Sequence, residues 1–338
     1  MDTNLSKYVL CIPHGGLNDM LCQIEVCLKY CRRHDRTLIL DTFRSGLRDN
    51  LLKYFSFLET CKVDVVAWDD VKDTLAGKTT FPEGLQPSLG CYNAENREGF
   101  AYLHPETRQK LTFDFTKSYN QDVLIHEACG GGINSYWLLQ HLDPTDWMIG
   151  KLKGVLAGLP DSFVAVHIRN TDLATDYRTF TNTIQWALSS ESVLLCTDSG
   201  VVQSEITNDQ RFKDSVFALS RLNPSSENRL HDQEATDESA NVDLFSDLVA
   251  MSLAKNLYFT FTRDGRVSGF SGLAFAASCS IFSRRLADHM GLRKTRSKVR
   301  IKALNQRWAL YVRHQLILIL AKKLIRVALV FRESIIKI

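Results

Sequence analysis

The chain has 338 residues, 45% of them hydrophobic and 23% charged, which is too long for one ordinary core and suits two domains. The formal net charge is only +3, and the segment 284–338 holds 15 of the 41 Lys and Arg residues against two carboxylates. This segment therefore carries +13 and the rest of the chain about −10. The chain is therefore basic only in this segment, and we expect no nucleic-acid partner.

Cysteine usage and the amino-terminal residues bear on the compartment. The nine cysteines show neither a C-x-x-C motif nor the Cys/His spacing of a metal site. Cys22, Cys27 and Cys31 fall in one expected helix, where small buried side chains are typical. Residues 1–7 are polar and lead directly into a strand, and the chain contains no run of 18 apolar residues. We therefore expect a cytoplasmic protein in a reducing compartment.

The chain opens with an expected strand, a glycine-containing turn and a helix. The strand covers Tyr8–Pro13, the helix runs from about residue 20 to residue 33, and the next strand covers residues 36–41. This order is typical of a right-handed parallel unit. Gly15 and Gly16 allow close approach of the backbone to a ligand, and the helix start at Asn18 supplies N–H groups. We name these three residues as candidate ligand contacts, although an ordinary strand-to-helix turn has the same composition.

A further strand is expected at residues 122–126, with a glycine-rich loop after it. Glu127 opens this loop, and Gly130–Gly132 could cradle a sugar or phosphate or act as a hinge. Helices are expected from Asn134 and from the segment 143–147, where proline and acidic residues suit a first turn.

The segment 163–172 carries the clearest chemical signal. Its first residues, Phe-Val-Ala-Val, are typical of a buried parallel strand. His167, Arg169 and Asp172 would then leave the carboxyl end of the strand, the edge at which open α/β sheets bind ligands. An arginine fork can bind two phosphate oxygens, and a carboxylate three residues later can orient it. The segment predicts a diphosphate site, with a surface salt bridge as the alternative.

The following segments again alternate between strands and helices. The expected elements are a strand at 193–197, a helix to 207, a polar loop at 220–241, a helix at 242–254, a strand at 257–261 and a helix at 273–278. Asp247 is a carboxylate near the apolar face of its helix. The hydroxyls of Ser268 and Ser271, just before the last helix, could accept a phosphate together with the helix N–H groups. The alternation predicts a second Rossmann-like domain.

The tail differs in kind from the rest of the chain. Between residues 308 and 331 apolar side chains recur at helical spacing and are interrupted by Lys and Arg. This pattern is typical of a basic amphipathic helix that binds an anionic membrane surface. A helix that packs back on the two domains is the alternative.

These residues together resemble one family, the GDP-fucose-dependent α1,6-fucosyltransferases of N-glycan core and rhizobial nodulation-factor synthesis. The segment 167–172, His-Ile-Arg-Asn-Thr-Asp, is similar to the phosphate-binding H-V-R-R-T-D stretch of that family. Four further blocks follow the family order: the glycine turn 15–21 with the strand 36–40, the helix 136–140 with Pro144 and Trp147, the strand end 196–198, and Asp247 thirteen residues before Thr260.

The resemblance implies a GT-B glycosyltransferase fold with two Rossmann-like domains and a cleft between them. It further implies inversion at the sugar carbon, no required metal and a donor held in the second domain. By this resemblance Arg169 and its neighbours bind the diphosphate, Asp198 at the second strand end is a further donor-binding residue, and Asp247 holds the guanine base.

The sequence also departs from the family pattern. Asn170 replaces the second arginine, and the catalytic glutamate of the family has no residue in register. Asp176 lies one position early and is our first choice for the general base, with Glu127 as the second. Arg169 would stabilise the departing diphosphate.

The combined interpretation is an inverting, metal-independent fucosyltransferase that moves a sugar from a GDP-sugar to a glycan, polysaccharide or lipopolysaccharide intermediate. Residues 1–155 would form the acceptor-side domain, 156–292 the nucleotide-sugar domain and 293–338 the tail. We expect the protein on the cytoplasmic face of the inner membrane, with no cofactor. The alternatives are a transferase of the same fold with another nucleotide sugar and a non-catalytic subunit that binds sugar or nucleotide in a membrane-bound glycan synthesis complex.

Overall fold

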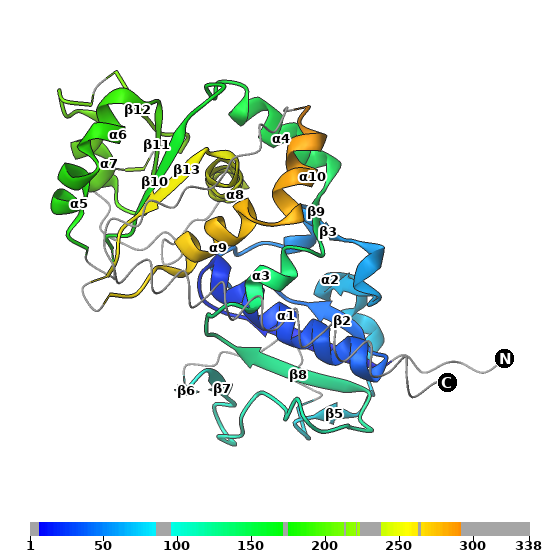
Figure 1. Cartoon of the computed structure of the whole chain (residues 1–338). Coiled ribbons are helices and arrows are strands. Elements are labelled where there is room, and N and C mark those ends of the chain that lie inside the picture. Colours follow the sequence, from blue (N-terminus) through cyan, green and yellow to red (C-terminus); the bar gives the residue numbers. More distant parts are fainter. Residues whose placement is uncertain are drawn as a thin grey trace, which may run out of the picture. The chain divides into compact units, whose positions relative to one another are not determined.

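Two sheets with parallel cores organise the chain in the computed structural model (Figure 1). The structure describes residues 7–85, 96–171, 175–212, 214–220, 222–223, 238–262 and 265–291, which all belong to one compact unit. Three predictions lie wholly or partly outside these residues: the donor contact of Asp172, most of the loop 220–241, and the tail helix after residue 293.

The first sheet has the strand order β4-β2-β1-β8-β7-β6, and β5 also pairs with β8. Its strands are β1 (Tyr8–Pro13), β2 (Thr37–Leu40), β4 (Val65–Ala67), β5 (Thr80–Phe81), β6 (Asn96–Glu98), β7 (Ala101–Leu103) and β8 (Val123–Ala128). The pairs among β4, β2, β1, β8 and β5 are parallel, whereas β6 and β7 form an antiparallel hairpin that joins β8.

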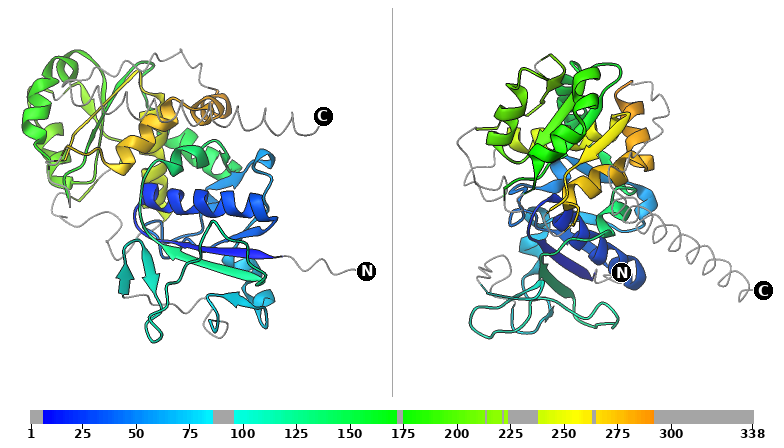
Figure 2. Two further views of the ribbon diagram at one scale, coloured as in Figure 1. Left: turned by 60° about the horizontal axis from the view of Figure 1, so that its bottom comes forward. Right: turned by 60° about the vertical axis from the view of Figure 1, so that its left-hand side comes forward.

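Helix α1 (Leu17–His34) covers one face of this sheet, with α3 (Asn134–Leu138) beside it (Figures 1 and 2). Cys22, Cys27 and Cys31 are buried in α1, as the sequence predicted for small apolar side chains. The helix begins three residues before the predicted start at Met20. Leu17 and Asn18 are already helical because both side chains are buried against the fold, and Gly16 is the last extended residue.

The second sheet is parallel throughout, in the order β12-β11-β10-β13. Its strands are β10 (Val164–Ile168), β11 (Val193–Thr197), β12 (Val216–Phe217) and β13 (Asn256–Phe259). The helices of this half are α5 (Tyr177–Thr183), α6 (Gln185–Ser190), α7 (Gly200–Thr207), α8 (Glu238–Leu253), α9 (Gly269–Ser278) and α10 (Ile281–His289).

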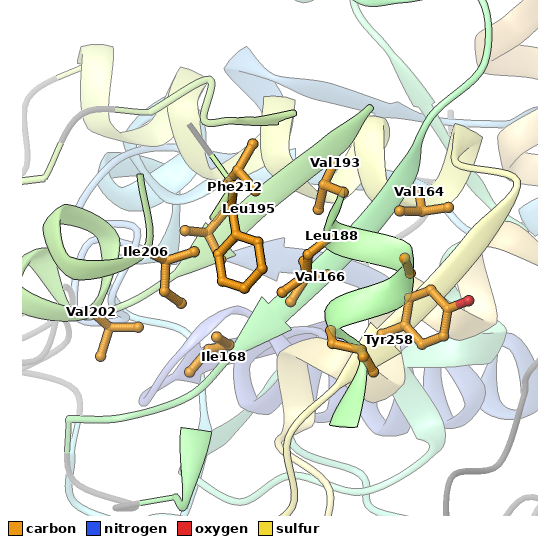
Figure 3. Close-up of a cluster of buried hydrophobic side chains, with 13 residues drawn as sticks. Val164, Val166, Ile168, Leu188, Val193, Leu195, Val202, Ile206, Phe212 and Tyr258 are labelled. Atoms are coloured by element: carbon orange, nitrogen blue, oxygen red, sulfur yellow. The ribbon is translucent and has the colours of Figure 1, made fainter. Parts of the chain in front are cut away.

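Side-chain alternation along β10 assigns its two faces. Val164, Val166 and Ile168 pack into a buried apolar cluster with residues of β11, α6 and α7 (Figure 3). Because successive side chains of a strand point to opposite faces, His167 lies on the other face, where it contacts α9. Strand packing thus decides which element His167 meets.

Short elements complete the described chain and correct one predicted boundary. They are η1 (Leu51–Lys53), β3 (Phe55–Phe57), η2 (Glu59–Cys61), α2 (Trp68–Val71), η3 (Lys72–Leu75), β9 (Leu142–Pro144) and α4 (Asp146–Leu156). The segment 142–144 pairs antiparallel with β3, so the helix predicted from residue 143 begins only after its N-cap, Thr145. Pro144 is therefore the end of a strand, and the prediction that it belongs to the first helical turn was wrong.

Side chains of the second half bind the first half directly. The guanidinium group of Arg285 donates to the carbonyl oxygens of Leu139, Gln140 and Leu142. The amide of Asn241 in α8 donates to the carbonyl oxygen of Leu47 at 2.9 Å. These bonds tie α10 to the segment around β9 and tie α8 to the loop after β2, so they link the two halves within the described unit.

Candidate functional site

Three neighbouring strands of the second sheet end around one cation. Arg169 directly follows β10, and its Nη1 lies 2.8 Å from Oδ2 of Asp198, which directly follows β11. The backbone N–H of Arg169 donates to Oγ1 of Thr260, the first residue after β13, at 3.2 Å. The arginine side chain keeps 19% exposure. The site is therefore a fixed cation at the carboxyl edge of a parallel sheet, the usual ligand-binding edge.

Asp198 organises the backbone after β10 as well as the arginine. Its carboxylate accepts from the N–H of Asn170 at 2.7 Å and from the hydroxyl of Thr171 at 2.6 Å. Asp198 is buried, so these donors and Arg169 replace the water that an exposed carboxylate would have. The sequence named Asp172 as the residue that orients Arg169, but among the described residues Asp198 provides this contact.

His167 is the penultimate residue of β10, so the prediction that it follows the carboxyl end of the strand was wrong. Its Nδ1 lies 2.6 Å from Oγ of Ser271, and Ser268 caps α9 by accepting from the N–H of Ser271 at 3.1 Å. Burial lowers the pKa of His167 to about 4, and the carboxylate of Asp198 opposes this shift only in part. A neutral, buried imidazole of this kind positions Ser271 and the start of α9; a direct donor contact of His167 stays a prediction.

The start of α9 lies against the glycine turn of the first half. A Cβ added at Gly269 would lie 2.8 Å from Nδ2 of Asn18, which is closer than side chains tolerate. Asn18 is held there because its Oδ1 accepts from the hydroxyl of Ser135 at 2.6 Å, while its Nδ2 donates to the carbonyl oxygen of Gly132 at 3.4 Å. The structure thus brings the predicted residue Asn18 together with the predicted serine cap of α9.

Gly15 and Gly16 form the turn that delivers Asn18. Gly15 has a φ of +85°, a conformation that residues with a side chain rarely adopt. Gly16 is extended and is the N-cap of α1. The turn therefore needs glycine at position 15 for its backbone shape, in addition to any role in ligand approach.

Asp247 is a buried carboxylate in α8 with one unsatisfied oxygen. Its Oδ2 accepts from the hydroxyl of Ser220 at 3.1 Å, whereas its Oδ1 has no hydrogen-bond partner among the described residues. Burial raises the pKa of Asp247 to about 7, against opposing hydrogen bonds from Ser220 and Cys196. Since buried polar atoms are nearly always paired, Oδ1 is suited to accept a hydrogen bond from a ligand.

A second polar cluster lies at the carboxyl edge of the first sheet. Glu127 is part of β8, not of the loop in which the sequence analysis placed it, and its side chain is fully buried. One oxygen, Oε1, accepts from Nε2 of His14 at 2.8 Å and from Nη1 of Arg44 at 3.0 Å. Neither His14 nor Arg44 was predicted from the sequence as a site residue. The only local signal was a histidine between a strand and two glycines.

Asp176 is an exposed residue at the start of α5. Its Oδ1 accepts from the N–H of Thr179 at 3.1 Å, which is the ordinary geometry of a helix N-cap. This contact gives Asp176 a structural role. Its predicted role as a general base stays a prediction.

The described residues bear on metal binding and on membrane insertion. They contain no group of three or more His, Cys, Asp or Glu side chains arranged to hold a metal ion. Within the same residues, no helix combines the length and the apolar character that crossing a membrane requires.

Comparison with known proteins gives matches only among solved structures, since no family model and no curated protein matches the chain. NodZ α-1,6-fucosyltransferase soaked with GDP-fucose matches with a TM-score of 0.53 and 17% identity, over 80% of this chain and 92% of that chain. NodZ from Bradyrhizobium matches with a TM-score of 0.52 and 16% identity, over 80% and 93%. The chain has the fold of NodZ.

The likeness to NodZ confirms the mixed α/β class with parallel sheets that the sequence predicted. NodZ co-crystallised with GDP matches in the same way, with a TM-score of 0.51 and 17% identity, over 80% of this chain and 92% of that chain. At these identities the likeness concerns the fold. The chemistry of the present chain is therefore argued from its own residues.

Proposed function

We propose that the chain is an inverting, metal-independent glycosyltransferase that moves fucose from GDP-fucose to a glycan, polysaccharide or lipopolysaccharide intermediate. The observation that carries the proposal is the Arg169–Asp198 pair at the meeting point of three strand ends, in a fold shared with NodZ. A cation held in this way is present before the substrate arrives and needs no rearrangement during the reaction.

The diphosphate of the donor would lie between Arg169 and the start of α9. The guanidinium group provides a planar set of donors, and the capped first turn of α9 provides N–H groups beside Ser268 and Ser271. As the bond from the sugar to the diphosphate breaks, negative charge grows on the leaving oxygen. Fixed donors at this place stabilise that charge more than they stabilise the bound substrate.

The guanine base would be held by Asp247. A carboxylate can accept from both N1–H and the N2 amino group of guanine, and Oδ1 of Asp247 has no partner among the described residues. Uracil and cytosine lack this pair of adjacent donors. We therefore propose that Asp247 selects the nucleotide.

We further propose the two-domain division in which residues 1–155 face the acceptor and residues 156–292 bind the nucleotide sugar. Each part has its own parallel sheet, and the contact between Asn18 and Gly269 links the glycine turn of the first to α9 of the second. Donor and acceptor would therefore meet near these loops.

Purified protein is expected to release GDP from GDP-fucose in the absence of acceptor, and to do so equally well in EDTA. The fixed guanidinium group and helix N–H groups take the place of a metal ion in this scheme. The measurement is GDP release, with the anomeric configuration of the released fucose followed by NMR. Binding of GDP without turnover would support a non-catalytic binding subunit, and loss in EDTA with recovery in Mn²⁺ would remove metal independence.

Removal of residues 300–338 is expected to abolish sedimentation with phosphatidylserine vesicles while GDP release persists. Lys and Arg contribute about 1 kcal/mol each near an anionic surface, and salt weakens this attraction. The full chain at high salt is the control. An unfolded truncated protein would instead indicate that the tail packs on the rest of the chain, and the proposed location on the cytoplasmic face of the inner membrane would lose its basis.

A further inference from the structure

The polar cluster of the first sheet contains a histidine that the diphosphate site does not use. His14 directly follows β1, and Glu127 is the penultimate residue of the neighbouring strand β8. Arg44 follows β2 and shares Oε1 of Glu127 with His14. Three adjacent parallel strands therefore bring these residues to one edge of the sheet.

The geometry separates the roles of the carboxylate and the imidazole. Glu127 is fully buried, so an acceptor sugar cannot reach it, whereas the side chain of His14 is 16% exposed. A carboxylate that already accepts from Arg44 accepts from Nε2–H of His14 as well. Nε2 is then the nitrogen that donates to the carboxylate, and Nδ1 is the ring nitrogen left to take a proton from a substrate.

The ring of His14 is also fixed in place. It stacks on Tyr102 of β7 with ring centroids 4.0 Å apart and an interplanar angle of 23°. The backbone N–H of His14 donates to the carbonyl oxygen of Ala128 at 2.9 Å. A ring held by a carboxylate, an aromatic face and its own backbone loses little freedom when it accepts a proton.

The glycine turn connects His14 to the place proposed for the donor. It precedes the turn of Gly15 and Gly16, and Asn18 in the first turn of α1 packs against Gly269 at the start of α9. The diphosphate is proposed to lie at this helix start. A sugar attached to it would lie near the turn that carries His14.

We infer that His14 is the catalytic general base of the transfer and that Glu127 is its positioning residue; this inference rests on the proposed function. The acceptor hydroxyl oxygen forms a bond to C1 of fucose, and the bond between C1 and the β-phosphate oxygen breaks. GDP leaves with the electron pair of that bond. The hydroxyl proton passes to Nδ1 of His14 and later to water, while Nε2–H stays on Glu127.

Charged and titratable groups from several elements lie around His14, and Asp19 of α1 lies against the adjacent Gly15. Glu127 and Arg44 contact each other beside the ring, and Tyr102 stacks on it. Asp41 follows β2; burial raises its pKa, and Arg44 opposes the increase. Burial also raises the pKa of Tyr102, which therefore remains a neutral phenol near neutral pH.

Azide separates proton removal from all other steps, because azide attacks C1 without a proton to lose. In His14→Gln and His14→Ala, GDP release with water as the acceptor is expected to fall by about a hundredfold or more, the usual scale for a lost general base. Formation of fucosyl azide from GDP-fucose is expected to stay near the wild-type rate. Glu127→Gln should lower the water reaction and keep the azide reaction. His104→Ala, a change of another histidine of the same half, should leave both reactions unchanged.

Four results would overturn the inference. One is an unchanged water reaction in both His14 variants, and another is an equal loss of the water and azide reactions. The third is an azide-rescued loss in Asp176→Asn with none in the His14 variants. A fourth result is that GDP stabilises neither His14 variant. His14→Gln keeps an N–H donor for Glu127, so this result would assign His14 a structural role. A wild type that releases no GDP removes the proposed function itself, whereas an active wild type with active His14 variants removes only the role of His14.

Discussion

Replacement of Arg169 by Ala or by Lys is expected to slow GDP release from GDP-fucose by more than about a hundredfold, or about 3 kcal/mol of lost transition-state stabilisation. One nitrogen of the guanidinium group already bonds Asp198, and the planar fork sets the direction of its other N–H donors. Lysine has one compact ammonium group, which cannot bond Asp198 and a diphosphate in the same geometry. Both variants should therefore fail by a similar amount.

A suitable control for Arg169 is Arg178→Ala. Arg178 pairs with Glu205 on the surface and is 74% exposed, so its loss removes the same charge far from the strand ends. GDP release should be unchanged in this control. Near-normal turnover in Arg169→Ala would remove the observation on which the proposed function depends.

GDP is expected to raise the thermal unfolding temperature of the wild type more than UDP, CDP or ADP do, and Asp247→Asn is expected to lose this preference. An unpaired buried polar group costs about 1 to 3 kcal/mol, so a nucleotide that cannot pair with Asp247 is disfavoured by that amount. The side-chain amide of asparagine has one acceptor atom, its oxygen, because its nitrogen is a donor. The asparagine variant therefore cannot accept from both guanine N–H groups with two separate atoms, as a carboxylate can. The measurement is the shift in unfolding temperature with each nucleotide.

The preference for GDP should also depend on pH. Because the pKa of Asp247 is raised to about 7, the group is protonated in the ligand-free protein below that pH and ionised above it. The carboxylate form accepts both guanine N–H groups, so the preference for GDP should grow as the pH rises from about 6 to about 8. Protonation contributes stability to the ligand-free fold, and this contribution is lost progressively as the pH rises from the unfolded value of 3.8 through about 7.

Asp161→Asn, a change of an exposed carboxylate before β10, is the control for Asp247 and should keep both the preference and its pH dependence. Equal stabilisation of the wild type by all four nucleotides would reject the guanine assignment. It would leave the diphosphate role of Arg169 in place.

Strands β1, β2, β8, β10, β11 and β13 were predictable because each one contains a short apolar run bounded by polar residues. Local sequence thus located β8, β10 and β11. Because the carboxyl ends of parallel strands share one edge of a sheet, the region around Arg169 could be predicted before its contacts were known. The sequence did not predict that Glu127 belongs to β8. The apolar run ends at Ile125, but pairing with β1 continues to Ala128.

The contacts that complete the candidate site are not local. Glu127 is 113 residues from His14 and 83 from Arg44, and neither pair forms a recognisable motif. Arg169 was expected to be oriented by a carboxylate three residues away, whereas the contact in the described chain comes from Asp198 on the next strand. Such pairs follow from strand order and register, which single-sequence patterns do not specify.

The contact between Asn18 and Gly269 limits how this chain can be redesigned. A side chain at position 269 would overlap the amide of Asn18, and a side chain at Gly131 would overlap both Asn18 and Asp19. Asn18 is therefore packed between residues that are more than 100 positions away in the sequence, Gly131 and Gly269. A larger residue at either glycine requires a smaller residue at position 18, so these three positions are expected to change together in engineered or naturally diverged versions of the protein.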